Sequence, residues 1–290
     1  MTIEQLIVLA IRASVFLLVF ALGLDAGWDD VTFLFRRPRL LVRSILSLNV
    51  VMVLVAVAIA SAFHVVSPDI KIALVSLAMS PVPPIFPKKQ HKVRGKSSYA
   101  IGLVVVAALF AVVLIPGWLE LLGHYFGFEV DAGLSEIIPI VLISILVPLF
   151  VGIVIRKFAP RFAARALNPV SIGATVLLLV AVLPILFKLA PAMWAALGHG
   201  VIWTMTLFGV VGLVVGHLLG GPDLEERSLL ALATSTRHPG IALAIASSNF
   251  PQQKNEVMVI VLYHLLVGTI IAIPYSRWRA RKRASLAAAQ

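Results

Sequence analysis

Long apolar stretches make up most of the chain, and the polar residues gather in short segments between them. Most of these stretches are close to the ~20 residues that a helix needs to cross a bilayer. Their residues do not alternate between apolar and polar, as they would in the strands of a membrane-spanning barrel. The pattern predicts an all-α membrane protein with nine transmembrane helices, near residues 5–24, 44–66, 70–95, 98–117, 135–155, 170–189, 199–220, 228–249 and 256–275.

Two of the nine segments carry helix-breaking residues about halfway along. Segment 70–95 has four prolines within residues 81–87, and segment 228–249 has Arg-His-Pro-Gly at residues 237–240. Because proline removes a helix hydrogen bond, each helix is expected to break after about 15 Å, which is half of the ~30 Å hydrocarbon core. The two segments are five helices apart and therefore cross in opposite directions. Such a pair is typical of secondary transporters built from inverted repeats.

This symmetry predicts how the single polytopic membrane domain, residues 1–290, is organised. The first repeat covers residues 1–117 with four helices, and the second covers residues 135–275 with five. Residues 276–290 form a basic cytoplasmic tail.

Composition and charge support a location in the lipid bilayer. The chain is 60% hydrophobic and 13% charged, whereas soluble domains are about 45–50% apolar and about 25% charged. The net charge of +11 could indicate nucleic-acid binding, but 19 of the 24 Lys and Arg residues lie on one side of the predicted helices and three on the other, with Arg12 and Arg237 inside helices. Basic loops face the cytoplasm. We therefore expect no nucleic-acid partner, and a multi-pass protein of the cell (inner) membrane with its N-terminus outside and its C-terminus cytoplasmic.

The two breaks form a candidate binding site for a small organic anion. Pro87 and Pro239 each suit the first position of a new half-helix, and helix N-termini attract anions. Arg237 is either an anion ligand or a structural group that caps the carbonyls of the broken helix. His238 is either a proton-coupling group or a hydrogen-bonding strut. Lys88 either lines a cytoplasm-facing vestibule or lies on a solvated short helix.

Three stretches carry a resemblance to a known family. They are LLVFALGLDAGWDDVTFLFRRPRLLVRSIL at residues 17–46, SPVPPIFPKKQHKVRG at residues 80–95 and ATSTRHPGIALA at residues 233–244. They resemble the early pattern and the two crossing motifs of the bile acid:sodium symporter (BASS) family. The resemblance covers nearly the whole chain and indicates a divergent nine-helix, bacterial-type member that lacks the family's first helix. It implies an inverted-repeat transporter with a core domain and a panel domain, in which the two broken helices cross.

The chain departs from that family at its sodium ligands. In the first crossing motif Phe86-Pro87 replaces a Ser-Asn pair and Gln90 replaces Thr. In the second motif Ala233 replaces the sodium-coordinating Glu, and Arg237-His238 replaces Gln-Asn. The candidate substrate-binding residues are therefore Arg237, His238, Pro239, Phe86, Pro87, Lys88 and Gln90.

These departures decide the expected function. All 13 acidic residues lie in predicted loops or at helix ends, and hard cations prefer oxygen ligands that include carboxylates. We expect a secondary transporter of a small organic anion, working by alternating access, that has lost the family's sodium ligands; a proton is the other possible coupling ion. The alternatives are an ordinary sodium:organic anion symporter whose ligands are misaligned here, and a transport-dead binding or sensor protein of the same fold.

Motifs for other chemistry are missing from the sequence. It carries no Ser-His-acid or paired-carboxylate arrangement, no metal-ligand spacing and no phosphate-binding loop. We therefore expect no enzymatic activity, no cofactor and no bound metal. The patterns do not indicate an oligomeric state or identify the substrate.

Overall fold

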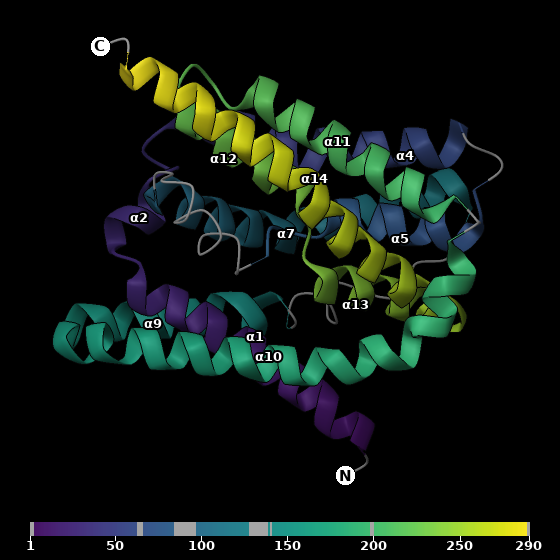
Figure 1. Cartoon of the computed structure of the whole chain (residues 1–290), viewed down its shortest axis with the longest axis horizontal. Helices are drawn as coiled ribbons and strands as arrows, with labels where there is room; N and C mark the ends of the chain where they lie inside the picture. Colours follow the sequence, from purple (N-terminus) through teal and green to yellow (C-terminus); the bar gives the residue numbers. More distant parts are fainter. Residues whose placement is uncertain are drawn as a thin grey trace.

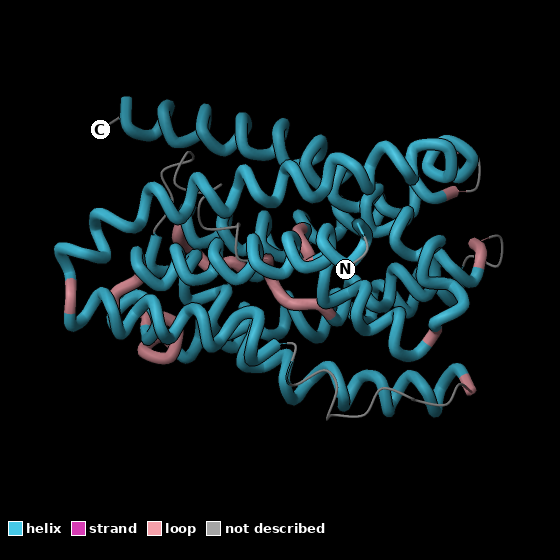
Figure 2. Tube along the Cα trace, turned by 90° about the horizontal axis from the view of Figure 1, so that it is seen from below, coloured by secondary structure: helices cyan, strands magenta, loops and turns pink. Residues whose placement is uncertain are grey.

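The structure, a computed structural model, describes residues 3–62, 66–83, 97–127, 139, 141–197 and 200–288. Throughout this described part the chain is helical, with loops confined to short connections (Figures 1 and 2). Helices satisfy every backbone hydrogen bond internally, as a hydrocarbon environment requires. The all-α prediction is therefore confirmed for these residues.

Within the described residues, six helices are long and apolar enough to cross a membrane, and each overlaps a predicted span. They cover 5–25, 38–62, 98–126, 160–196, 201–219 and 251–286. The other three predicted spans are those that break or are only partly described.

The helices separate into two groups that pack mainly within themselves (Figure 1). The first group consists of α1 (Ile3–Asp25), the short π-helix η2 (Leu142–Leu146), α9 (Val147–Phe158) and α10 (Pro160–Ala196). The second consists of α3 (Pro38–Ile45), the π-helix η1 (Leu46–Val51), α4 (Met52–Ala62), α5 (Pro68–Met79), α7 (Ser97–Phe126), α11 (Val201–Leu219), α12 (Leu224–Ser235), α13 (Pro239–Asn249) and α14 (Lys254–Ala288). The short helix α2 (Trp28–Thr32) joins the groups and packs on α7. Contacts between the groups are few and run mainly from α10 to α14 and from η2 to α7.

Glycines allow close backbone contact within each group. A Cβ atom on Gly152 of α9 would lie 2.6 Å from the Phe20 carbonyl oxygen of α1. A Cβ atom on Gly216 of α11 would lie 2.5 Å from both the Ala231 Cα and the Leu230 carbonyl oxygen of α12. Inside a membrane the hydrophobic effect does not drive helices together, because lipid tails are as apolar as the side chains. Small residues at helix crossings allow the close backbone packing that holds such helices together instead.

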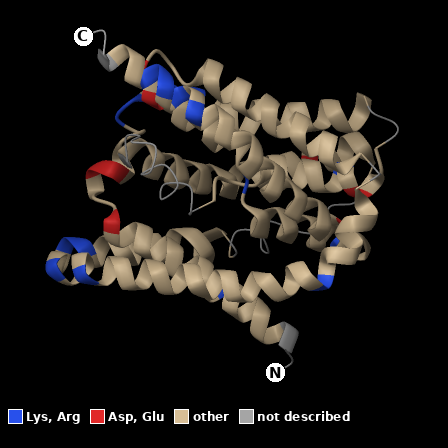
Figure 3. Cartoon of the chain, in the orientation of Figure 1, with Lys and Arg blue, Asp and Glu red and all other residues tan. Residues whose placement is uncertain are grey.

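Charged side chains collect at one end of the molecule (Figure 3). There Arg37 binds Glu226 at 2.6 Å, Arg283 approaches Glu225 at 3.5 Å and Arg156 lies 4.0 Å from Asp25. These pairs place the start of α3, the start of α12, the end of α14 and the α1–α9 contact at the same end. Few Lys, Arg, Asp or Glu residues lie in the bundle between the two ends (Figure 3).

Several helix boundaries differ from the sequence prediction: α14, for example, continues to Ala288 through most of the expected tail 276–290. Helix α10 begins at Pro160, far ahead of the expected span 170–189, because Pro160 occupies its first turn and only Ala159 separates it from α9. Arg161 and Arg165, expected in a loop, therefore lie on α10. Helix α7 runs through Pro116 to Phe126, beyond the expected end at residue 117.

Both predicted breaks are visible in the described part of the chain. Helix α5 ends at Met79, and Ser80 is extended with ψ 145°. Helix α12 ends at Ser235, and α13 begins at Pro239 after the extended residue Thr236. Each first half-helix has 12 residues, or about 18 Å, so both end deep inside a bilayer-sized bundle.

Candidate functional site

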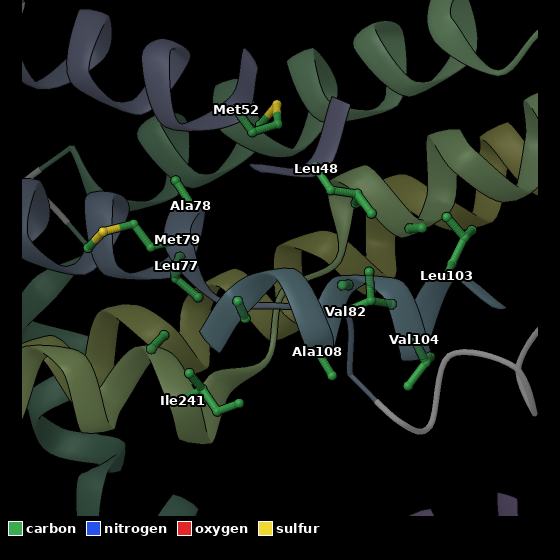
Figure 4. Close-up of a cluster of buried hydrophobic side chains, with 14 of the residues drawn as sticks. Leu48, Met52, Leu77, Ala78, Met79, Val82, Leu103, Val104, Ala108 and Ile241 are labelled. Carbon is green, nitrogen blue, oxygen red and sulfur yellow. The ribbon is translucent and has the colours of Figure 1, made fainter. Parts of the chain in front are cut away.

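The two breaks touch each other. The backbone N–H of His238 donates to the carbonyl of Pro81 at 2.9 Å, and Nη1 of Arg237 donates to the carbonyl of Ser80 at 3.3 Å. Leu77, Ala78 and Met79 at the end of α5 belong to one buried apolar cluster with Ile241 of α13, Leu48 of η1 and Leu103 of α7 (Figure 4). The end of the first half-helix therefore contacts the second break, as far as the structure describes the first break.

Local chemistry explains why the second helix breaks at this point. Pro239 has no backbone N–H and occupies the first turn of α13, where helix N–H groups have no intrahelical partner. His238 is the N-cap, and its Nδ1 accepts a hydrogen bond from the N–H of Ile241 at 3.3 Å. Upstream, the Thr236 hydroxyl donates to the carbonyl of Leu232 at 2.6 Å and so satisfies the end of α12. The end of α12 and the start of α13 therefore both have local hydrogen bonds that stabilise the break.

Arg237 lies at the centre of this contact and is 1% exposed. Its Nη1 donates to the carbonyl of Leu48 at 2.9 Å as well as to Ser80. Its Nε and Nη2 are buried and have no hydrogen-bond partner among the described residues. No carboxylate in the described part of the chain forms a salt bridge with it. The guanidinium is a buried positive charge with one end capped and with one edge that no described residue binds.

The Nε–Nη2 edge of Arg237 has a definite geometry. Nε–H and Nη2–H are the parallel donors on the long side of the guanidinium, the pair that binds a carboxylate or phosphate in a bidentate manner. His238 adds a third donor. Because its Nδ1 accepts from Ile241, the neutral ring carries its proton on Nε2, and this buried atom also has no partner. We call Arg237 and His238, with these three donors, the break site.

The acceptor of Arg237 on the neighbouring span comes from a π-helix. Leu48 lies in η1, whose wider hydrogen-bonding pattern interrupts the α-helical ladder, and π-segments are frequent at functional sites. The adjacent Ser47 hydroxyl bonds the Thr234 hydroxyl at 2.7 Å and ties η1 to α12 one turn before the break. The sequence analysis missed both Leu48 and Ser47. Backbone carbonyl ligands leave no residue-type signal, and the Leu-Ser-Leu-Asn-Val-Val sequence of η1 has no helix breaker.

The remaining candidate residues cannot be placed. Phe86, Pro87, Lys88 and Gln90 lie outside the described residues. Of the seven candidates, Arg237, His238 and Pro239 are located, and all three belong to the break that meets the end of α5. Among the residues that the structure describes, no cluster of three or more His, Cys, Asp or Glu could hold a metal ion.

A charged group at the meeting point of two discontinuous helices is an arrangement characteristic of membrane transporters. Comparison with known families agrees with this class. The chain belongs to the sodium bile acid symporter family, whose profile matches residues 13–192. It is a family of transporters and not of enzymes. A search of curated protein sequences found no significant match.

The extent of the family match is informative about the site. It covers α1 to most of α10 and ends before α11. The second break, with Arg237 and His238, lies outside the matched residues. The resemblance that the sequence analysis extended over nearly the whole chain is therefore shown for residues 13–192.

Proposed function

We propose that the protein is a secondary transporter of a small organic anion that works by alternating access and binds the anion at the break site. The observation that carries this proposal is the buried, unpaired charge of Arg237. An ion in a protein interior without a partner costs several kcal/mol. An anion with two oxygens on the Nε–Nη2 edge would offset that cost and would form charge-assisted hydrogen bonds.

The capping role of Arg237 does not compete with this function. Nη1 alone reaches the carbonyls of Leu48 and Ser80, and the other two nitrogens remain for a ligand. The two interpretations of Arg237 from the sequence thus describe two edges of one side chain. Capping holds the guanidinium in a fixed orientation, which lowers the cost of ordering it when an anion binds.

The division into two helix groups supports alternating access. The group of α1, η2, α9 and α10 corresponds to the panel domain implied by the family resemblance, and the other group, which contains both breaks, corresponds to the core domain. Few contacts join them, so one can move against the other without breaking a large interface. In this proposal nine helices form two inverted repeats, and the charged end in Figure 3 faces the cytoplasm.

Sodium coupling is the competing function because the family is one of sodium symporters. Two features argue against it. The family's sodium-coordinating Glu is replaced by Ala233, and the carbonyls of Leu48 and Ser80, which could hold a cation, already accept from Arg237. A sodium ion at this place would also be repelled by the guanidinium.

Binding and uptake assays separate these functions. A thermal-shift screen with small carboxylates and sulfonates would first find anions that bind the purified protein. Uptake of a labelled hit into proteoliposomes would then be measured with an imposed sodium gradient, an imposed proton gradient, or neither. We expect uptake to be unchanged when potassium replaces sodium.

Two results would contradict the proposal in different ways. A tenfold loss of affinity without sodium, equivalent to about 1.4 kcal/mol, would indicate a working sodium site. Anion binding without uptake under any gradient would indicate a binding or sensor protein.

A further inference from the structure

His264 brings a third buried basic side chain next to the break site. We propose that His264 binds the proton that enters with the anion, so that the site takes up one anion and one proton together. This proposal depends on the anion-binding function proposed above. It assigns the coupling ion and names the residue that carries it.

The fold places His264 level with the break. Helices α13 and α14 form an antiparallel hairpin around the short 3-10 turn at Pro251–Gln253. His238 precedes α13 and lies about 16 Å from the hairpin turn, and His264 lies about 15 Å along α14 from the same turn. One turn farther on, Gly268 faces the carbonyl oxygen of Ser235, which a Cβ atom would approach to 3.9 Å. Helix α14 therefore runs alongside the unwound residues.

His264 lies in a closed, apolar environment with one free ring nitrogen. It is 2% exposed, its ring lies 5.7 Å from that of Phe208, and its Nδ1 is buried with no partner. Burial acts against a proton on its ring, and the positive charge of Arg237 acts against it as well. An imidazole with an uncommitted nitrogen is the side chain best suited to gain and lose a proton near neutral pH.

His238 is less suited to this role although it belongs to the break site. Its Nδ1 accepts from the N–H of Ile241 and caps α13. Adding a proton there would remove the cap and leave a buried N–H without an acceptor, which costs free energy. Protonation of His264 breaks no hydrogen bond in the described structure. Of the two histidines, only His264 can change its charge while the break keeps its shape.

Electrostatics couples the proton to the anion. Without an anion, a proton on His264 would add a second positive charge beside Arg237, and the two charges would repel each other in a medium that screens poorly. A bound monoanion neutralises Arg237 and attracts the proton. Because such coupling is reciprocal, the proton must raise the affinity for the anion by the same factor. The proton comes from the aqueous phase with the anion and returns to it with the anion.

Other titratable groups on the elements around α14 lie farther along their helices. On α14 itself, Glu256 is two turns away. On α11, His217 bonds the hydroxyl of Tyr275 at 2.8 Å, three turns along α14 from His264. The groups on the remaining neighbours are Asp69 and Lys71 at the start of α5, Arg161, Arg165 and Lys188 on α10, and Glu225, Glu226 and Arg227 at the start of α12; His238 before α13 is the one already placed level with His264.

The test measures proton uptake when a non-titrating anion binds. Benzenesulfonate is ionised at every accessible pH, so any pH dependence of its binding arises in the protein. Isothermal titration of the purified protein in buffers of different ionisation enthalpy gives the number of protons taken up. We expect about one proton per anion near neutral pH, and an affinity that rises by up to about tenfold for each pH unit that the pH is lowered.

The decisive variant is His264→Gln, which keeps a polar side chain that cannot titrate. We expect it to bind benzenesulfonate at every pH with the weaker, high-pH affinity of the wild type and with no proton uptake. His264→Phe, which keeps a ring against Phe208, serves the same purpose if the first variant does not fold. His217→Gln is the matched control and should keep full proton uptake.

Three outcomes would overturn this inference. Wild-type protein that binds benzenesulfonate without proton uptake contradicts it and leaves the anion site intact. Proton uptake that persists in His264→Gln places the proton on another group. No binding of benzenesulfonate or of any anion in the panel shows that the anion site itself is wrong.

Discussion

The substitution Arg237→Gln separates the two roles of this side chain. Glutamine keeps a polar amide of similar reach and removes the charge. In the anion-free protein, one nitrogen of Arg237 is shared between the carbonyls of Leu48 and Ser80, and two nitrogens have no partner. The variant therefore loses the charge from two hydrogen bonds that share one nitrogen, and it also removes a buried ion that has no counter-ion among the described residues.

The magnitudes predict the direction of the change in stability. A hydrogen bond from a charged donor contributes about 1.5–3 kcal/mol, whereas burying an uncompensated charge costs several kcal/mol. Removing the cost of the buried charge therefore stabilises the variant at least as much as the weakened hydrogen bonding destabilises it. We expect the anion-free variant to be as stable as the wild type, or more stable.

When an anion is added, the wild type should become more stable than the Arg237→Gln variant. At an anion concentration of about 100 times Kd, the wild type gains about 2.7 kcal/mol. If the loss of the charged contacts weakens binding about 100-fold, the variant gains only about 0.4 kcal/mol at the same concentration. Arg237→Lys should recover part of the effect, because it restores the charge without the bidentate edge.

The assay is thermal unfolding in detergent with and without benzenesulfonate. Arg12→Gln is the matched control, since Arg12 also lies within a predicted span but is exposed on α1; it should keep the full anion shift. A variant at position 237 that melts far below the wild type without anion, yet keeps a normal anion shift, would show that Arg237 is only a cap. The assignment of the site would then be wrong.

Three further predictions concern packing, charge and orientation. Gly216→Ala should destabilise the protein by about 1–3 kcal/mol, because the new methyl group meets the backbone at Ala231; Gly173→Ala, with open space around it, should have little effect in the same unfolding assay. Burial and the nearby charge of Glu256 raise the pKa of Asp69, which precedes the predicted span 70–95. Ionised Asp69 therefore destabilises the folded state, and the free energy of unfolding falls as the pH rises through the raised pKa of this carboxyl. The substitution Asp69→Asn should raise the melting temperature at neutral pH and have a smaller effect near pH 4. A reporter fused to the C-terminus should be cytoplasmic and a tag at the N-terminus external, and finding both on one side would refute the odd number of spans.

The sequence predicted those parts of the fold that depend on residue type. Apolar runs of sufficient length became long helices, and Pro239 marked the start of α13, because a residue without an N–H can be accommodated only in the first turn of a helix. The Pro-rich stretch after Ser80 correctly indicated the end of α5. In these cases a local steric or hydrogen-bonding rule allows only one kind of backbone structure at that position.

The sequence could not predict features that depend on which distant residue or backbone atom a side chain meets in the fold. The π-helix at Leu46–Val51 forms within an unbroken apolar run, and nothing in that run distinguishes it from an α-helix. The carbonyl acceptors of Arg237 belong to backbone atoms that every residue has. His264 stands alone among apolar residues in the sequence, and its position opposite the break follows from the length of the α13–α14 hairpin and not from its neighbours in the sequence.

Two departures from the family pattern have a joint consequence. Position 233 carries Ala where the resemblance implies Glu, and position 237 carries Arg where it implies Gln. The two positions are four residues apart, the first in the last turn of α12 and the second beyond its end at Ser235. A Glu at position 233 would add a negative charge near the break; the alanine, which is fully buried, adds none. In the terms of the resemblance, the two changes exchange a negative group for a positive one, and a positive site favours a bound proton only when an anion binds with it. That is the charge balance a proton on His264 requires.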